Sequence, residues 1–571
     1  MGRLVQFASL FLVVIAISCT AVTPASSPGG TGNPAGSLRA TRPLTMSIRT
    51  EPPTLTQKVL SSGVGTSFAV TQRLFNATLG MFDGKGSQVP YLAETLPQLD
   101  TDSWRTFPDG RMETTHRLKP NLVWHDGTPL SADDFVFALQ VYTSADIGIG
   151  NVAPQSLIAE ASAPDARTLV IRWKRPYPYA AVLPVDAFPP LPSHLLREAF
   201  ERAPATLITQ PFFGSDYISA GPYRLTRWEP GAFIEGAAFE GHVLGKPKID
   251  RIKLVFISDS NVALANLLSG DVDFAADSSI RFEEGQILRR QWAGNNGGTV
   301  LVRPGSYRGV FFQLRPQVAN PRALLDVRVR RALAHSTDRQ ALSDGLFDGQ
   351  GVMSEVPFIS PRISYAPEIE KAAATYPLDP RATERLMAEA GLVKGADGFY
   401  SSPTEGHLQF DLNTLAGPYR EAEITTLASG WRQVGFDFKE SLMPPALAAD
   451  NQARARFPGL FSYSTGTGEY SLAAFTKAGI GTPENRWIGP NRPGWSNPEF
   501  DRLSDLFLST VEQPERVRLI AQMVKIMSED LPSIPLMYEL AAYAHVAAVR
   551  GPSVEADEAV VGWNIHEWEM D

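Results

Sequence analysis

Cysteine is almost absent from this chain, since Cys19 is the only one in 571 residues. A single thiol excludes an intramolecular disulfide and any metal site built from several cysteines. The eight histidines are scattered, and no two of them lie three or four positions apart. The sequence therefore shows no histidine metal site, and we expect no bound cofactor.

Runs of basic residues are missing as well. The formal net charge is −9, whereas nucleic-acid binders are usually basic. The chain also lacks the short motifs of common catalytic centres, namely Gly-x-Ser-x-Gly, His-Glu-x-x-His, the phosphate-binding Gly-x-x-x-x-Gly-Lys-Ser/Thr and the dinucleotide fingerprint. The sequence thus favours neither a nucleic-acid partner nor an enzyme.

Two patterns are open to a catalytic interpretation. His125 and Asp126 are neighbours, but adjacent residues in a turn rarely face each other, which favours a turn over an acid–base pair. The segment 465–468 (TGTG) is glycine-rich but lacks the strand–helix frame and the lysine of a phosphate-binding loop. Neither pattern gives a positive signal for catalysis.

The longest apolar run near the N-terminus is short. Met1 to Arg3 gives a positive start, residues 10–17 are apolar, and Ser18-Cys19 follow. The run is too short to span a bilayer, so we predict a signal peptide over residues 1–18. The residues before Cys19 resemble a bacterial lipobox with Ala16 where leucine is usual, which predicts lipidation of Cys19. The alternative is a secreted protein with an unmodified cysteine.

Residues 19–42 are rich in Thr, Ser, Pro and Gly and carry almost no large apolar group. Such a segment cannot bury enough surface to fold, so we predict a flexible linker between a lipid anchor and a folded body. An acylated Cys19 would hold that body outside the cytoplasmic membrane and close to it. We therefore expect an extracytoplasmic lipoprotein, periplasmic or on the cell surface.

The body alternates predicted strands and helices. Residues 123–142 predict a strand, a turn at Asp126-Gly127 and a helix with a near-capping box formed by Ser131 and Asp134. Further strands are predicted at 44–48, 104–107, 112–118, 169–173 and 252–256. Further helices are predicted to begin after Asp259 or Ser260, and after Asp326, Asp338, Asp379 and Asn497. This order predicts a mixed α/β fold with more than one sheet.

Four blocks of the body resemble family 5 of the bacterial ABC-transporter solute-binding proteins, the oligopeptide-, dipeptide- and nickel-binding group. They are 117–135 (RLKPNLVWHDGTPLSADDF), 221–273 (GPY to DVD), 326–339 (DVRVRRAL to DR) and 495–536 (WSNPEFD to LPSIPL). The first departs from the family pattern at Pro120-Asn121-Leu122 and at Phe135. Together the blocks span about residues 44–540.

The resemblance implies a two-lobed, periplasmic-binding-protein-like α/β fold (type II, cluster C-like) with an extra domain beside lobe I. We expect lobe I at 43–80, 205–300 and 528–571, the extra domain at 81–204, and lobe II at 301–527. The implied protein is a monomer that encloses a peptide or other small polar solute between its lobes and delivers it to the ABC permease. An exported hydrolase or a ligand-sensing lipoprotein on the same fold is the alternative.

The ligand site is predicted from residues 461–470, which precede the block that begins at residue 495. Peptide binders of the family hold the ligand's free amine with an aspartate there, whereas this segment has no aspartate and offers Glu469 instead. Arg486, Trp487 and Arg492 can form an anion clamp with an aromatic wall, with ordinary surface charge as the alternative. The full set of predicted ligand contacts is Tyr307, Tyr463, Ser464, Thr465, Thr467, Glu469, Arg486, Trp487, Arg492 and Tyr538. Nickel is not expected, because no histidine cluster is present.

Overall fold

The computed structural model describes residues 42–56, 58, 68–147, 154–183, 187–448, 450–556 and 559–571. The predicted signal peptide and the lipidation of Cys19 lie outside the described residues. Within these ranges, no helix combines the length and the apolar character that crossing a bilayer requires.

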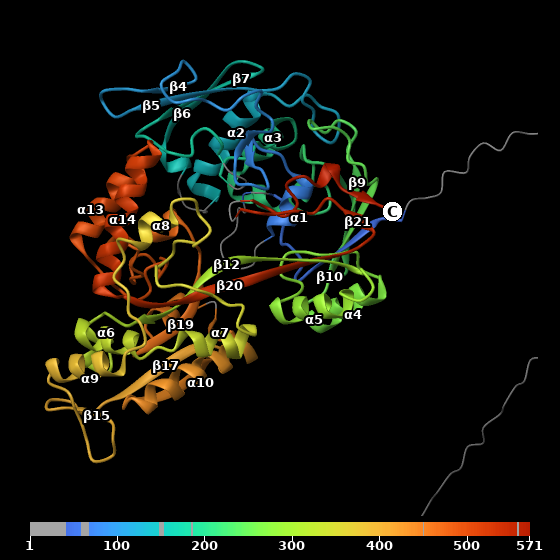
Figure 1. Ribbon diagram of the computed structural model, residues 1–571. Coiled ribbons are helices and arrows are strands. Elements are labelled where there is room, and N and C mark those ends of the chain that lie inside the picture. Colours follow the sequence, from blue (N-terminus) through green and yellow to red (C-terminus); the bar gives the residue numbers. More distant parts are fainter. Residues whose placement is uncertain are drawn as a thin grey trace, which may run out of the picture. The chain divides into compact units, whose positions relative to one another are not determined.

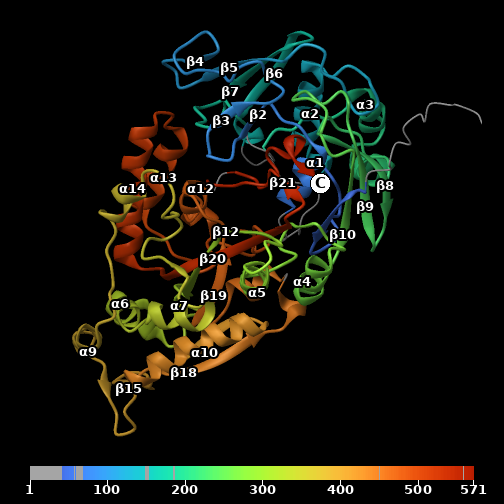
Figure 2. The same ribbon diagram turned by 45° about the vertical axis from the view of Figure 1, so that its right-hand side comes forward.

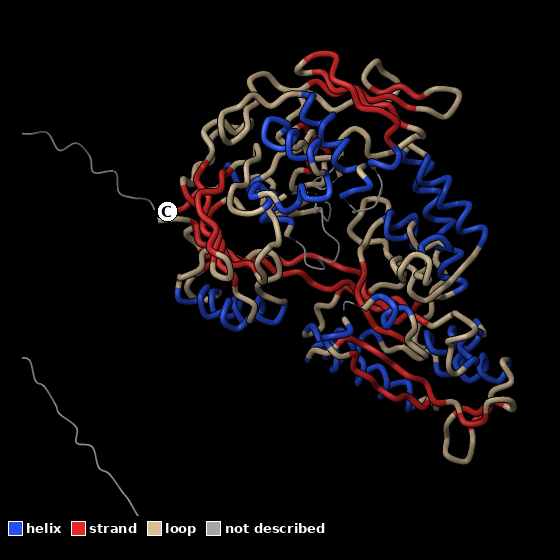
Figure 3. The backbone as a smooth tube through the Cα atoms, turned by 180° about the vertical axis from the view of Figure 1, so that it is seen from behind, coloured by secondary structure: helices blue, strands red, loops and turns tan. Residues whose placement is uncertain are grey.

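A sheet of eleven strands runs through the described residues, in the order β18-β17-β19-β12-β20-β11-β1-β10-β9-β8, with β13 paired to β20. Its centre is the antiparallel pair of two long strands, β12 (Gly298–Phe312) and β20 (Ser533–Val546). Figures 1 and 3 show that this pair runs between two groups of elements, which we call lobe I and lobe II. The two lobes are thus joined by continuous sheet hydrogen bonding.

Lobe I consists of the strands on the β11 side of the crossing and the helices that cover them. The strands are β1 (Leu44–Ile48), β8 (Tyr223–Glu229), β9 (Phe233–Ala238), β10 (Arg251–Phe256) and β11 (Phe274–Ala275). The helices are α1 (Ala69–Phe75), α4 (Ser260–Ser269) and α5 (Phe282–Trp292). Strand β1 pairs in parallel with both β10 and β11.

Beside lobe I lies a separate four-stranded sheet in the order β4-β5-β7-β6, at the top of Figure 1. Its strands are β4 (Trp104–Thr106), β5 (Met112–Arg117), β6 (Ile158–Asp165) and β7 (Thr168–Trp173). The neighbouring elements are β2 (Gly80–Phe82), β3 (Gln88–Pro90), α2 (Ala132–Thr143) and α3 (Ser193–Arg202). We call this group the extra domain.

Lobe II is built on β17 (Gln409–Leu415), β18 (Asp437–Met443) and β19 (Leu460–Thr465), where β17 pairs in parallel with both neighbours. Its helices are α6 (Val327–His335), α7 (Arg339–Phe347), α8 (Ala366–Glu370), α9 (Pro380–Glu389), α10 (Pro418–Gln433), α11 (Asn451–Ala455), α12 (Glu469–Ala473), α13 (Pro498–Ser509) and α14 (Gln513–Asp530). Short strands complete it: β13 (Val352–Met353), β14 (Val393–Lys394), β15 (Tyr400–Ser402) and β16 (Gly406–His407). A small pair, β21 (Val549–Arg550) and β22 (Glu569–Met570), ends the chain.

Helix starts follow the capping residues that the sequence predicts. The side chains of Asp259, Asp326, Asp338, Asp379 and Asn497 each accept a hydrogen bond from a backbone N–H in the first turn of α4, α6, α7, α9 and α13. These side chains satisfy amides that have no partner inside the helix. The five predicted helix starts are confirmed.

The prediction for residues 123–142 is confirmed in part. The turn is present, because Gly127 has a φ of +86° and its N–H donates to the Trp124 carbonyl over 2.9 Å. The capping box of α2 is present as well, and Trp124 and Phe135 are buried. The predicted strand is wrong: Val123 forms only an isolated bridge with Pro129, because the chain reverses at Gly127 before a ladder can extend.

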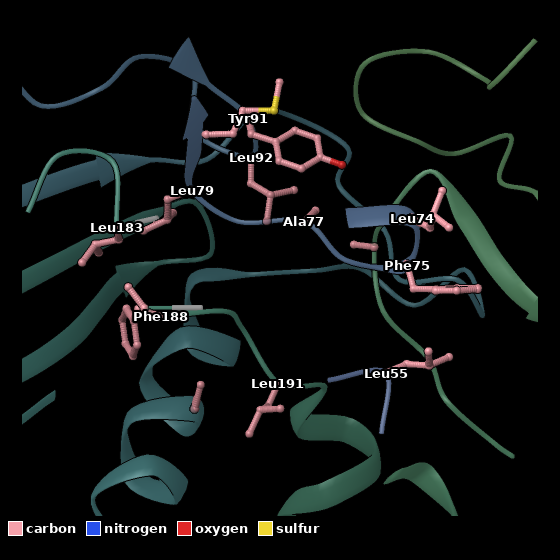
Figure 4. Close-up of a cluster of buried hydrophobic side chains, with 14 of the residues drawn as sticks. Leu55, Leu74, Phe75, Ala77, Leu79, Tyr91, Leu92, Leu183, Phe188 and Leu191 are labelled. Atoms are coloured by element: carbon pink, nitrogen blue, oxygen red, sulfur yellow. The ribbon is translucent and has the colours of Figure 1, made fainter. Parts of the chain in front are cut away.

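Hydrophobic clusters divide the interior. One cluster contains residues of both lobe I and the extra domain. Figure 4 shows part of this cluster, with Leu74 and Phe75 of α1 and with Phe188 and Leu191 of the extra domain. Lobe II contains two further clusters, one with Trp431 and one with Met523. The first half of β20 packs into these two, whereas Ala542 and Ala544 belong to a fourth cluster beneath α4 and α5. The first half of β20 therefore packs in lobe II, and its second half packs in the cluster beneath α4 and α5.

Two buried histidines predict that the folded protein loses stability in acid. Burial lowers the pKa of His116 to about 4, and burial followed by the charge of Arg73 lowers that of His242 to about 3. In the unfolded chain the histidine pKa values are near 6.5, so below that pH the unfolded chain binds more protons than the folded protein. Each neutral, buried histidine therefore stabilises the folded protein fully above about pH 6.5. This stabilisation is lost as the pH falls toward 4 for His116 and toward 3 for His242.

We expect the free energy of unfolding to fall by up to about 1.4 kcal/mol per pH unit for each of the two histidines in this window. A His242→Gln variant, measured by urea unfolding between pH 7 and 4.5, should show a shallower slope than the parent protein. The exposed His407, whose pKa the Asp437 carboxylate raises, serves as the control because His407→Gln should not reduce the acid loss. Equal slopes for the parent and His242→Gln would contradict the prediction.

Candidate functional site

A cavity of about 560 Å³ lies beside the crossing of β12 and β20. Its walls come from the crossing strands (Arg303–Ser306 and Glu539–Tyr543), from lobe I (Arg49, Ser278 and Ile280–Glu283) and from lobe II (Phe347, Ala416, Gly417, Tyr419, Arg420, Gly466 and Thr467). This volume falls in the range of small-molecule sites. A ligand in the cavity would contact both lobes.

Strand direction explains why these residues meet. On the lobe II side, Ala416 follows β17 and Gly466 follows β19, two parallel strands that end at the same edge. On the lobe I side, Arg49 follows β1 and Ser278 comes shortly after β11, again parallel neighbours. Ligands of open α/β sheets bind at the carboxyl ends of the strands. The cavity is bounded by two such edges, one from each lobe.

An irregularity in β12 shapes the wall between the lobes. Pro304 pairs with Leu540 and Tyr307 pairs with Tyr538, so Gly305 and Ser306 together oppose the single residue Glu539. Such a bulge bends a strand and re-aims a side chain. Gly305, Ser306 and Glu539 all line the cavity.

A buried ion pair lies directly behind Glu539. The Arg308 guanidinium donates to both carboxylate oxygens of Glu423, over 2.9 Å from Nη2 to Oε1, and both side chains are almost fully buried. Arg308 Nη1 also donates to Glu539 Oε1 over 3.2 Å, and Ser464 Oγ donates to the same oxygen over 2.5 Å. Burial opposes the charge of Arg308, yet Glu423 raises its pKa above the usual value. This network holds the Glu539 carboxylate at the cavity wall.

Positive charge predominates among the lining side chains, which include Arg49, Arg281, Arg303 and Arg420 but only Glu283 and Glu539 as acids. Arg420 lies in the first turn of α10. Burial lowers its pKa, and the charges of Arg308 and Arg281 lower it further. The lining is therefore a surface on which arginine side chains outnumber carboxylates.

The structure brings one of the ten sequence-predicted contacts, Thr467, to the cavity wall. Thr465 ends β19 two residues before it, and Ser464 lies behind the wall in the Glu539 network. Tyr307, Tyr463 and Tyr538 are buried in lobe II, and the Tyr463 ring stacks on Phe311 at 4.1 Å. These tyrosines are not among the residues that line the cavity.

The predicted anion clamp lies in the loop before α13. The Arg492 guanidinium sits over the Tyr463 ring, 4.9 Å from its centroid. Trp487 packs beneath Arg456 at 5.9 Å, and Arg486 adopts a positive φ of +56°. None of Arg486, Trp487 and Arg492 lines the cavity, so their role in binding stays a prediction.

Glu469, the predicted amine anchor, already has partners. Its carboxylate accepts hydrogen bonds from Arg516 of α14, from Tyr365, and from Tyr179 of the extra domain, the last over 3.0 Å. The side chains of Arg516 and Glu469 are 9% and 10% exposed. The cluster joins the extra domain to lobe II, where Figure 2 shows α13 and α14 close to β4 and β5.

Sequence reasoning missed Arg49, Arg281, Arg420 and Glu539. Arg420 carried a usable signal, since it follows Gly417-Pro418, where proline occupies the first position of α10 directly after a parallel strand. Arg281 is the N-cap residue of α5 and has no such proline signal beside it. Among the described residues, no group of three or more His, Cys, Asp or Glu side chains is arranged to hold a metal ion.

The fold is that of the two-lobed bacterial solute-binding proteins. The NikZ protein of Campylobacter jejuni, solved in complex with Ni(L-His), superposes with a TM-score of 0.73 over 92% of this chain and 99% of its own, at 22% identity. Residues 94–479 match the family model for bacterial extracellular solute-binding proteins, family 5. The chain belongs to this family, as its sequence blocks predict.

Two curated relatives support the assignment. Protein XP55 of Streptomyces lividans is 30% identical over 431 residues, which cover 74% of this chain and 70% of the relative. An ABC transporter peptide-binding protein of Brucella ovis is 24% identical over 313 residues, which cover 53% of this chain and 54% of the relative. The chain thus spans about half the length of that relative. The family and the named ABC relative are substrate-binding components of transporters.

A Glu469→Gln variant separates a structural role from ligand binding. Removing the charge leaves Arg516 buried without a carboxylate, which should cost about 3 kcal/mol or more. We expect a clearly lower melting temperature by scanning fluorimetry. The exposed Glu512, which precedes α14, provides the control, because Glu512→Gln should change stability little. An unchanged melting temperature for Glu469→Gln together with lost ligand binding would instead identify Glu469 as a ligand anchor.

Proposed function

We propose that this chain is the extracytoplasmic solute-binding component of an ABC importer and that it captures a peptide or another small polar solute. The observation that carries the proposal is the composition of the cavity, whose walls come from lobe I, lobe II and the strands that join them. A ligand stabilises a closed arrangement of two lobes only through contacts that the open arrangement lacks. A solute in this cavity would contact both lobes at once.

The solute would be held by the cavity walls. Thr467 is the sequence-predicted contact that we retain with the strongest support, and we add Arg281, Arg420 and Glu539. Backbone groups at Gly305 and Ser306 lie beside them. The other nine sequence-predicted contacts remain predictions, as does the division into lobes at residues 43–80, 205–300 and 528–571 against 301–527.

The sequence and the family support a location outside the cytoplasm. We propose that residues 1–18 are removed as a signal peptide, that Cys19 is lipidated, and that residues 19–42 tether a monomeric body near its permease. The family description, extracellular solute-binding proteins, supports export. A tether fits the role, because it keeps the loaded protein within reach of the membrane transporter.

Ligand capture is tested with the full-length protein. Native mass spectrometry should show a bound small molecule, and adding back the released solute at a hundredfold excess over its Kd should stabilise the protein by about 2.7 kcal/mol. An Ala541→Trp variant fills the cavity and should lose both effects, whereas Ala547→Trp, at an exposed alanine just beyond β20, should keep them. Conversion of the solute to products, rather than its intact recovery, would contradict a binding role and favour an exported hydrolase.

Lipidation is tested at Cys19. We expect the parent protein to fractionate with membranes and to carry the added mass of acyl chains on its N-terminal peptide. A Cys19→Ser variant should appear in the soluble extracytoplasmic fraction, because the anchor is lost while the folded body is unchanged. Equal membrane association of the two proteins would argue against the lipoprotein.

A further inference from the structure

The lining of the cavity has an excess of arginine over acidic side chains. Four arginines and two glutamates line it. Within the described ranges, Arg49, Arg281 and Arg420 form no ion pair with a carboxylate, although ion pairs are formed by many other arginines of the chain. Unpaired guanidinium groups around a concave site favour an anionic occupant.

The two acids offset this excess only in part. Glu539 accepts hydrogen bonds from Arg308 and Ser464 through one oxygen, so half of its carboxylate is already engaged. Glu283 lies exposed in the first turn of α5. Arg49, Arg281 and Arg420, which form no ion pair within the described ranges, outnumber these two acids in the lining.

Backbone dipoles reinforce the side chains. Phe282 and Glu283 begin α5, and Tyr419 and Arg420 lie in the first turn of α10, and all four residues line the cavity. These helices are eleven and sixteen residues long. Helix N-termini carry partial positive charge and favour anions. One N-terminus comes from lobe I and the other from lobe II.

We propose that the solute is a small organic anion with about two negative charges, in which one anionic group binds Arg420 of lobe II and a second binds Arg281, with Arg49 nearby, of lobe I. The inference rests on the proposed function and names the ligand class for the same cavity. Planar guanidinium groups pair with carboxylate or phosphate oxygens through two hydrogen bonds. A ligand with two such groups links the lobes by charge, so that closure depends on both anionic ends.

The experiment offers the full-length, ligand-free protein a pool of synthetic tripeptides Xaa-Ala-Xaa in which Xaa is Glu, Gln, Lys or phosphoserine. Bound species are identified by native mass spectrometry, and each Kd is then measured. We expect the Glu or the phosphoserine peptide to bind about tenfold or more tightly than the Gln peptide, the difference expected for one charge-assisted hydrogen bond. Which of the two prevails separates a carboxylate from a phosphate ligand. The affinity should also decrease with rising salt concentration.

Single variants test the named arginines. Arg420→Gln and Arg281→Gln should each reduce the preference for the acidic peptide about tenfold, with melting temperatures confirming that both variants fold. Arg290→Gln serves as the control, because it removes the same charge from an exposed position near the end of α5, outside the cavity.

Binding of the Gln or Lys peptides as tightly as the acidic ones, or a preference unchanged in both Arg420→Gln and Arg281→Gln, would overturn the anion inference while leaving a solute-binding function intact. Failure to bind any peptide in the pool, together with no solute in the native spectrum of the freshly purified protein, would overturn the proposed function as well. The two failures are therefore distinguishable.

Discussion

The antiparallel pairing of β12 with β20 is the constraint on which the rest of the structure depends. Both strands take part in lobe I and lobe II, and the hydrophobic environment of β20 changes along its length from the lobe II clusters to the cluster beneath α4 and α5. The bulge at Gly305 and Ser306 interrupts this pairing where Glu539 meets the cavity. One ladder thus joins the lobes, and one local defect in it forms part of the wall between them.

Charge is arranged in two layers around this crossing. The inner layer is the buried pair of Arg308 and Glu423, which compensate each other in a medium where an unpaired charge would be costly. The outer layer consists of Arg281, Arg420 and the other ionisable side chains at the cavity surface, with an excess of positive charge. Both lobes contribute to this cavity, and arginines outnumber acids in its lining.

The segment 463–469 illustrates what the sequence predicts about the cavity and what it does not. The segment reaches the cavity, because Gly466 and Thr467 line it. It does not identify the contacts, since side chains alternate along β19: Ser462 and Ser464 face the Glu423 network, whereas Tyr463 stacks on Phe311 on the other side of the sheet. Glu469 looks available in sequence, but Arg516 and Tyr179, which bind it, come from distant parts of the chain.

The sequence by itself determined the helix starts at Asp259, Asp326 and Asn497, the turn at Gly127 and the family, because capping, glycine conformation and motif order are local properties of the chain. Which residues form the cavity wall was decided only by the tertiary structure. The charged residues of the wall are spread along the sequence from Arg49 to Glu539. Arg303 and Glu539 lie within the crossing strands, whereas Arg49 follows the end of β1, and Arg281 and Arg420 lie at the starts of α5 and α10. Parallel pairing aligns those ends at one edge in each lobe, and the β12–β20 crossing places the two edges opposite each other.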